Sequence, residues 1–353
     1  MEGKKQRDVS FDIMKALAIF LVVLGHCMQS LYPEKGDFLG KPLFLYVYSF
    51  HMALFMMISG YFSTRALEGS FKELIISKSR QLLQPAVVTG GGIIVVELII
   101  KLISCQVIII SEEVMTFVMD LWFLKSLFIL FILSWAIVRL VDKLGIWGLA
   151  ISLVFAFVAS HLVNIYAIAV YLPCFILGYI LKRINFFNMK KAVLLSVLAV
   201  AVLIYFILLQ WWDYDFGEYE FFNIRRVAQI DQSMMDGLLA EIRRITIGIT
   251  GGLSVMLIIK LLFSYLGKSW NESKYVKSMQ GYGMETLGIY CLQAIVLERL
   301  MKEFTDFSML SINVFSYVLA PLLSIFVLWI CLSLSKWIHS KKTLDLVVFG
   351  NRR

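Results

Sequence analysis

Three ionisable residues occur in the stretch FDIMKALAIFLVVLGHCMQS, residues 11–30, which is otherwise apolar enough to cross a membrane. In a helix, Lys15 and His26 are separated by three turns plus about 20°, so they face the same side about 16 Å apart along the axis. Asp12 lies within about 40° of that face. An ammonium group binds anions, and an imidazole exchanges protons near neutral pH. The stripe therefore predicts an anion-binding group near one membrane surface and a general base deeper in the bilayer.

A second histidine, His51, stands in the next apolar stretch, YVYSFHMALFMMISGYFSTRAL, residues 46–67. Consecutive spans run in opposite directions, which brings His51 and His26 to a similar depth. Two histidines without a suitably placed carboxylate are too few for a metal site, so proton transfer is favoured. A structural alternative stays open for each group: an interfacial ion pair for Asp12 and Lys15, and a helix–helix hydrogen bond for His26.

The composition indicates which elements carry these groups. Of the 353 residues, 60% are hydrophobic and 16% are charged, whereas soluble proteins have about 45–50% and about 25%. The apolar residues form long blocks, as in a polytopic helical membrane protein, and not the short alternating segments of a β-barrel. The expected fold is all-α, a membrane bundle of about ten transmembrane helices. The expected spans are 11–31, 42–63, 83–104, 117–138, 146–161, 163–181, 191–211, 243–265, 283–301 and 311–337.

Basic residues orient the bundle. Loops rich in Lys and Arg alternate with neutral or acidic loops, and the segments at both ends of the chain are basic. Cytoplasmic loops carry the excess of basic residues, so both termini are expected in the cytoplasm. We expect one integral-membrane domain, residues 1–340, and a short basic cytoplasmic tail, residues 341–353. The net charge of +8 is explained by these loops, and no basic stretch belongs to a soluble domain that would bind nucleic acid.

The cysteines predict no site, and one long loop has two open interpretations. The five cysteines lie in or beside apolar segments without a CxxC spacing, so neither a disulfide framework nor a zinc site is predicted. Residues 212–241 form a long loop on the expected external side, rich in aromatic and acidic residues. It is a candidate to hold a sugar by ring stacking, or alternatively an amphipathic segment anchored at the interface.

Several motifs, taken in order, resemble acyltransferase family 3, the multi-span enzymes that acylate sugars of cell-surface glycans. Lys15, ten residues and His26 are similar to the family's Arg/Lys-to-His pattern, with Asp12 before it. Similar landmarks follow over about residues 11–300: FHMALFMMISGYF with His51 and Ser59, SRQLLQP with Arg80 and Pro85, LWFL with Trp122, YLPCFILGYIL with Pro173 and Gly178, and METLGIYCLQAIV. In the last of these, Gln293 stands where relatives often have His, and Thr286 replaces Ser. Glutamine exchanges hydrogen bonds but no proton at neutral pH.

The resemblance implies a membrane-bound O-acyltransferase of the bacterial inner (cytoplasmic) membrane. It would move an acetyl group from acetyl-CoA, a co-substrate, to a hydroxyl of a cell-surface polysaccharide or glycolipid sugar. Lys15 and Arg80 would hold the coenzyme A phosphates. His26 would act as general base or carry the acyl group transiently, and His51 would orient His26 or donate to the thioester oxygen.

The remaining site expectations follow from the same resemblance. Asp12 joins the two histidines as a catalytic residue, and Trp122, Ser59 and Gln293 are expected to contact substrate. The expected partners are acyl-CoA, a sugar or glycan acceptor and membrane lipid, with no metal and no nucleic acid. A homo-oligomer stays open.

The main alternative is a membrane transporter or flippase for a glycolipid or small anion, which also needs about ten helices and buried ionisable groups. Transporters commonly contain inverted repeats with broken helices in corresponding halves. The one glycine-interrupted segment, TGGGIIVVELIIK at residues 89–101, has no matching partner. A non-catalytic scaffold would leave Lys15, His26 and His51 without a role, so an enzyme is preferred.

Overall fold

The chain folds as an all-helical membrane protein. The computed structural model describes residues 8–32, 41–145, 147–148, 151, 167–211, 233–305, 307 and 309–350, and within them the regular structure is helical, without a strand. Seven helical stretches in this part of the chain are long and apolar enough to cross a membrane: Val9–Leu31, Pro42–Tyr61, Phe71–Ile103, Trp122–Leu144, Lys191–Leu209, Leu239–Gly267 and Ile312–Ser340.

These seven stretches overlap seven of the expected spans, although Phe71–Ile103 begins well before 83–104 and Trp122–Leu144 is shifted relative to 117–138. The expected span 163–181 overlaps helix α9 (Ile168–Arg183), and 283–301 overlaps α13 (Thr286–Ile295) and the π-helix that follows it. The expected span 146–161 lies almost entirely outside the described residues. The number ten and the cytoplasmic position of the termini stay predictions.

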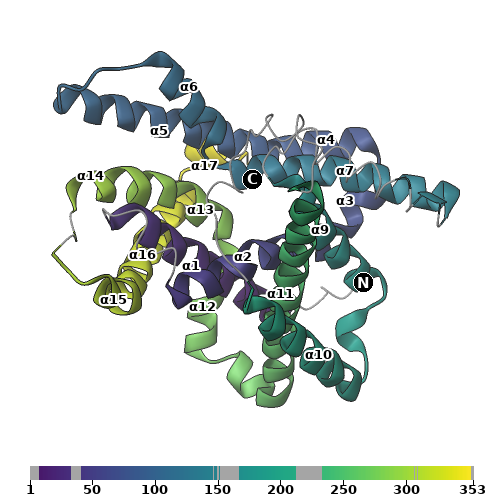
Figure 1. The fold of residues 1–353 in the computed structure, drawn as a ribbon. Helices are drawn as coiled ribbons and strands as arrows, with labels where there is room; N and C mark the ends of the chain where they lie inside the picture. Colours follow the sequence, from purple (N-terminus) through teal and green to yellow (C-terminus); the bar gives the residue numbers. More distant parts are fainter. Residues whose placement is uncertain are drawn as a thin grey trace.

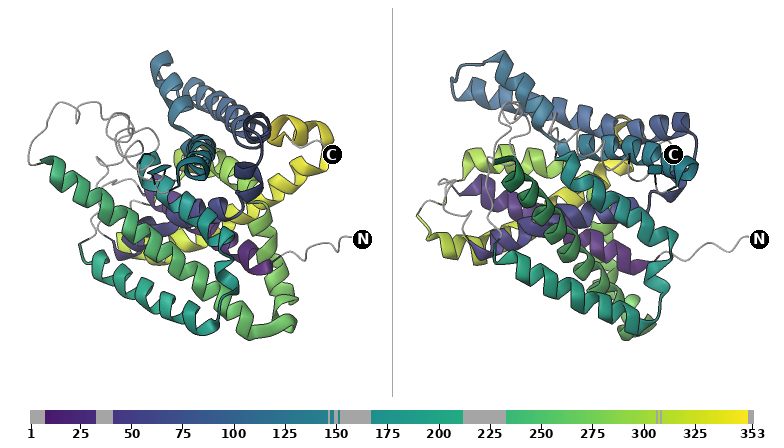
Figure 2. Two further views of the ribbon diagram at one scale, coloured as in Figure 1. Left: turned by 90° about the vertical axis from the view of Figure 1, so that its right-hand side faces the viewer. Right: turned by 45° about the vertical axis from the view of Figure 1, so that its right-hand side comes forward.

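Helices α1 (Val9–Leu31) and α2 (Pro42–Tyr61), which carry the two histidines, occupy the centre of the molecule (Figures 1 and 2). Helix α2 packs between α9 and α11 (Ser233–Asn271), and α1 packs against α12 (Lys274–Met284) and α16 (Ala320–Ser340). In Figure 1 a layer formed by α4 (Phe71–Lys78), α5 (Gln84–Ile103) and α7 (Trp122–Leu144) lies above this centre. Helix α10 (Lys191–Leu209) packs along α11 below it. The histidines are therefore enclosed from several sides.

Glycines allow α2 and α9 to approach closely. A Cβ at Gly60 would lie 1.9 Å from the carbonyl oxygen of Phe175, and a Cβ at Gly178 would lie 2.0 Å from that of Met57. Lipid tails are as apolar as leucine, so membrane helices associate chiefly through close packing, for which small residues are suited. The two glycines thereby fix α2 against its neighbour.

Charged and polar side chains fix the first turn of α1. Asp8 is the N-cap, and its carboxylate accepts hydrogen bonds from the amide (3.2 Å) and hydroxyl (2.6 Å) of Ser10. Such a cap satisfies backbone donors that have no partner within the helix. Lys260 of α11 forms an ion pair with the same carboxylate. This end of α1 is therefore held to α11.

Three π-helical segments interrupt the regular helices: Ser79–Leu83 (η1), Val296–Met301 (η5) and Phe315–Leu319 (η6). The wider π turn often marks a functional site, and η1 carries Arg80. The remaining short elements are α3 (Thr64–Glu68), α6 (Ile110–Met119), η2 (Phe186–Asn188), α14 (Lys302–Phe304), α15 (Ile312–Val314) and α17 (Lys342–Phe349).

Candidate active site

A histidine and a glutamate face each other where α1 meets η5. Nδ1 of His26 lies 3.0 Å from Oε1 of Glu298, and the two side chains are 25% and 20% exposed. A carboxylate accepts but does not donate, so Nδ1 carries the hydrogen and Nε2 is the basic nitrogen of the neutral ring. This arrangement orients the imidazole and would stabilise the cation formed on protonation of Nε2.

Glu298 belongs to a wider polar network. Its Oε1 also accepts a hydrogen bond from Nε2 of Gln293 at 2.9 Å. The neighbouring Arg299 lies 2.7 Å from Oε1 of Glu97 and 2.5 Å from Oδ2 of Asp120. Buried charges persist when they are paired and hydrogen-bonded. Segments from α5, the α6–α7 turn and η5 are thus tied together beside His26.

Lys125 fixes the turn that carries Asp120. Its ammonium donates to the carbonyl oxygens of Phe117, Val118 and Asp120 at 2.6, 2.9 and 2.8 Å. These carbonyls end α6, where intrahelical donors are lacking. The turn is therefore held in place by a side chain of α7.

His51 is buried beside His26. Its Nδ1 lies 2.7 Å from the carbonyl oxygen of Val47, and Tyr48 packs edge-on against its ring at 4.7 Å. The carbonyl only accepts, so Nδ1 donates and Nε2 is again the basic nitrogen in the neutral ring. A Cβ at Gly25, the residue before His26, would lie 2.6 Å from the ring of Tyr48, so Tyr48 links His51 to the turn of α1 that carries His26.

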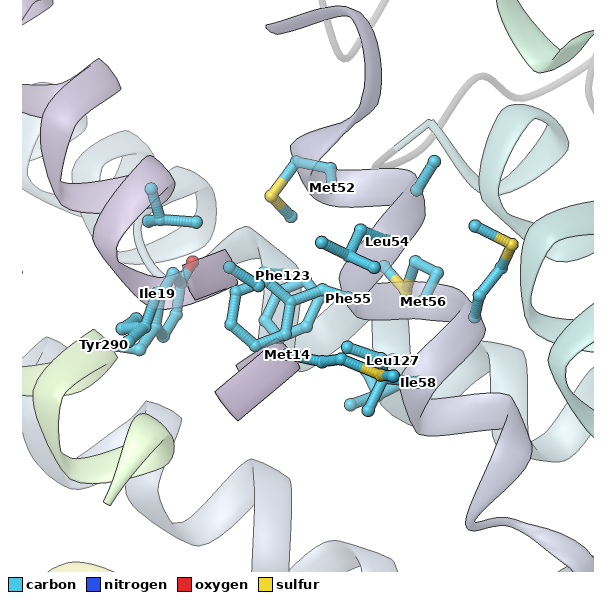
Figure 3. Close-up of a cluster of buried hydrophobic side chains, with 14 of the residues drawn as sticks. Met14, Ile19, Met52, Leu54, Phe55, Met56, Ile58, Phe123, Leu127 and Tyr290 are labelled. Atoms are coloured by element: carbon cyan, nitrogen blue, oxygen red, sulfur yellow. The ribbon is translucent and has the colours of Figure 1, made fainter. Parts of the chain in front are cut away.

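Two adjoining cavities lie on the Lys15 side of the histidines. The first, about 260 Å³, is mainly apolar and brings together Val22 of α1, Met52 and Phe55 of α2, Phe123 of α7 and Tyr290 of α13. Figure 3 shows the rings of Phe55 and Phe123 next to each other, with Tyr290 on the side of Ile19. Val22 stands one turn before His26, so this cavity extends along the predicted stripe towards the histidine.

The second cavity, about 710 Å³, is polar and includes both residues expected to bind phosphate, Lys15 and Arg80. It shares Lys15, Gln81, Thr286 and Leu287 with the apolar cavity. The ammonium of Lys15 lies 4.7 Å from the ring centre of Phe62. The residues that complete the polar lining are Ser77, Gly283, Met284, Glu285, Gly288, His339, Phe349 and Gly350.

The other expected site residues lie at different distances from the histidines. Ser59 lines the apolar cavity, and Gln293 contacts Glu298, as above. Trp122 begins α7 and stacks on Tyr171 with ring centres 5.9 Å apart. Asp12 accepts a hydrogen bond from Gln280 at 2.8 Å and lies about 21 Å from His26 along the helix axis, a position that favours a structural contribution.

Much of the long aromatic loop lies outside the described residues, as does the part that was expected to hold a sugar. Among the residues that the structure does describe, no group of three or more His, Cys, Asp or Glu side chains is arranged to hold a metal ion.

Glu298 and Arg299 are the functional candidates that sequence reasoning missed. The available signal was an adjacent acid and base inside an expected span, because ionisable residues within a membrane commonly mark function. Their partners could not be read from spacing, since His26, Glu97 and Asp120 come from other segments. The i,i+5 contact between Gln293 and Glu298 also depends on the π turn.

Comparison with known proteins identifies the family. Residues 8–336 match the model of the Acyl_transf_3 family, described as an acyltransferase domain. The chain is 32% identical over 188 residues to nodulation protein NolL of Mesorhizobium japonicum, covering 51% of this chain and 49% of that protein. It is 42% identical over 85 residues to nodulation protein NolL of Sinorhizobium fredii, covering 24% and 23% respectively.

These alignments span about half or less of the length of each curated relative. No solved structure matches the chain significantly. The family model, in contrast, covers nearly all of the chain, including both histidines, Glu298 and the residues that line the apolar cavity. The chain therefore belongs to acyltransferase family 3.

Proposed function

We propose that this protein is an O-acetyltransferase that moves an acetyl group from acetyl-CoA to a hydroxyl of a cell-surface polysaccharide or glycolipid sugar. The observation that carries the proposal is the joined pair of cavities leading from Lys15 and Arg80 towards His26. Coenzyme A has a polyanionic end and a long, largely uncharged arm that ends in the thioester. A polar cavity with two cations, continued by an apolar cavity, matches that order of chemical groups.

The cations bind the phosphates in this account. Lys15 acts as a compact point charge, whereas the fork of Arg80 can form two hydrogen bonds to one phosphate. Among the described residues Arg80 forms no side-chain ion pair, so its charge is not already neutralised. The thioester arm then lies between Met52, Phe55 and Tyr290.

His26 performs the proton transfer. As the acceptor hydroxyl attacks the thioester carbonyl, its proton passes to Nε2 of His26. The carbon–sulfur bond then breaks and the proton passes from the imidazolium to the departing thiolate, which leaves as coenzyme A. Glu298 stabilises the imidazolium between these two steps. A carbonyl hydrogen bond to Nδ1 leaves neutral His51 an acceptor at Nε2, and Nε2 of neutral His26 is an acceptor too. His51 is therefore proposed to accept from a substrate hydroxyl, and not to bond His26 or donate to the thioester oxygen.

Gln293 is proposed to contact the acceptor. Its Oε1 is buried and has no hydrogen-bond partner among the described groups, while its amide nitrogen is held by Glu298. A buried acceptor without a donor is costly, and a sugar hydroxyl would satisfy it. Ser59 is proposed to contact the donor arm, and Trp122 to offer a ring for the sugar.

The expected location is the bacterial inner membrane, with acetyl-CoA supplied from the cytoplasm. The proposal is tested with the purified protein, labelled acetyl-CoA and a cell-envelope glycan extract. We expect label to appear on the glycan as an ester that mild base removes, with release of one coenzyme A per ester. Flux of a glycolipid or anion across vesicles, without ester formation, would instead identify a transporter.

Rapid quenching in denaturant at neutral pH, which preserves an acyl-imidazole, separates the two chemical routes. Direct transfer predicts no labelled protein before the glycan is labelled. Labelled protein that appears first, and that is lost in His26→Ala, would establish a transient acyl-imidazole.

A further inference from the structure

The end of the chain forms part of the polar cavity. Helix α16 ends at Ser340, and after Lys341 the chain turns directly into α17. An eight-residue helix is not stable by itself in water, so tertiary contacts must hold it. Its residues Asp345 and Phe349 are buried, 1% and 4% exposed, although residues 341–353 were expected to be only a basic tail.

One histidine connects α17 to the start of α13. Nδ1 of His339 lies 2.7 Å from Oδ1 of Asp345, and Nε2 lies 3.0 Å from Oε2 of Glu285. The hydroxyl of Ser335 donates to the same oxygen of Glu285 at 2.8 Å. The ring of His339 also packs on Phe349 with centres 4.7 Å apart. Glu285 immediately precedes α13, the helix that carries Tyr290 and Gln293.

The other end of α17 is held by the segment that carries Arg80. The side-chain amide of Gln84 donates to the carbonyl oxygens of Leu346 and Val347 at 2.6 and 2.9 Å. Gly350 ends the helix with φ +68°, and a Cβ there would lie 2.8 Å from the carbonyl oxygen of Arg80. This position combines a left-handed backbone with a close approach, so glycine is the residue that fits.

These contacts place α17 across one side of the cavity. His339, Phe349 and Gly350 line it together with Lys15 and Arg80. Loss of the contacts at His339 would release both α17 and the segment Glu285–Leu287. Thr286 and Leu287 of this segment also line the apolar cavity. The buried carboxylate of Asp345 would then lose its hydrogen bond to His339, which is costly.

We infer that α17 is a wall of the donor site and that His339 is a positioning residue that holds this wall between Glu285 and Asp345. The inference rests on the proposed function, because the nucleotide end of acetyl-CoA is the ligand assigned to this cavity. His339 acts on binding of the nucleotide end and not on proton transfer at His26. Its removal should therefore change the KM for acetyl-CoA far more than kcat.

The kinetic test uses the full-length protein in detergent or nanodiscs. We expect His339→Ala to raise the KM for acetyl-CoA about tenfold and to change kcat by less than about twofold. His339→Gln, whose side-chain amide can replace one of the two contacts of the ring, should give an intermediate KM. The matched control is Ser333→Ala on the same helix, because that exposed hydroxyl donates to the Trp329 carbonyl one turn earlier and Ser333 lines neither cavity. Its KM should equal that of the wild type.

Hydrogen exchange on the wild type gives a second test without any substitution. Saturating coenzyme A should slow amide exchange in residues 342–349, since the ligand contacts the helix. Unchanged exchange there, or a wild-type KM in His339→Ala, would overturn this inference while leaving the proposed function intact. A wild-type protein that neither binds coenzyme A nor consumes acetyl-CoA would overturn the proposed function itself, and this inference with it.

Discussion

Glu298 determines the chemistry available to His26. A lone histidine in a membrane helix is accounted for by a simple hydrogen bond between helices. A carboxylate 3.0 Å from Nδ1 instead fixes the tautomer, directs Nε2 away from Glu298 and stabilises the protonated ring. Helical geometry was sufficient to predict the stripe of Lys15 and His26. The partner of His26 was not predictable in this way, because it comes from a segment at the other end of the chain.

Replacing Glu298 by glutamine should slow the chemical step. The amide keeps the size and a hydrogen-bond acceptor but removes the charge that stabilises the imidazolium. We expect kcat to fall about 100-fold or more, with the KM for acetyl-CoA unchanged. Steady-state kinetics checks this, with Glu303→Gln, an exposed glutamate in the next helical turn, as the matched control. A kcat within about twofold of the wild type would remove Glu298 from proton transfer.

Lys15 is proposed to bind the phosphates of the donor. Lys15→Ala removes one of two cations in the polar cavity, so the KM for acetyl-CoA should rise about tenfold while kcat falls less. The control is Lys72→Ala, because Lys72 is exposed on α4 and does not line either cavity. Equal donor affinity in Lys15→Ala and Lys72→Ala would contradict the assignment.

At the scale of elements, close packing positions α2 and with it His51. The glycine-interrupted segment at residues 89–101 lies within the continuous helix α5 (Gln84–Ile103). Backbone N–H and C=O groups in a membrane have no water to bond. The hydrogen bonds within the helix therefore persist even where glycine would weaken a helix in water. Glycine content did not reveal which glycines are packing contacts. That distinction depends on which helices are neighbours.

Gly178→Ala tests this packing. The added methyl would lie 2.0 Å from the carbonyl oxygen of Met57, so α2 and α9 must separate, which should cost about 1–3 kcal/mol of stability. Gly91→Ala is the matched control, because nothing lies within 4 Å of a Cβ there. Thermal unfolding in one detergent should show a lower Tm for Gly178→Ala and an unchanged or higher Tm for Gly91→Ala. Equal Tm values for the two variants would disprove the close contact.

At the scale of the whole molecule, hydropathy predicted an all-helical membrane protein, and loop charge predicted its orientation. The all-helical membrane fold is confirmed, whereas the number of ten spans and the orientation stay predictions. The cavities were beyond sequence reasoning, because their walls combine α1, η1, the start of α13 and α17. Residues 342–349, part of the expected basic cytoplasmic tail, form helix α17 and line the polar cavity, with Asp345 and Phe349 in contact with His339 of α16.

A native cysteine can test the orientation. Cys105 is exposed, whereas the other four cysteines are buried, and the ten-span topology places the loop after α5 outside the cytoplasm. A membrane-impermeant maleimide should therefore label intact cells that express the wild type, and Cys105→Ser should abolish the label. Labelling that appears only after the cells are opened would reverse the predicted topology.

The central claim is that His26 takes the proton of the acceptor hydroxyl. The most direct measurement is single-turnover acetyl transfer by His26→Ala, made beside equilibrium binding of coenzyme A to the same preparation. We expect transfer to fall by a factor of about 100 or more, while the Kd for coenzyme A stays within about twofold of the wild type, because the phosphates bind at Lys15 and Arg80. Transfer at the wild-type rate by a variant that binds coenzyme A normally would contradict the account.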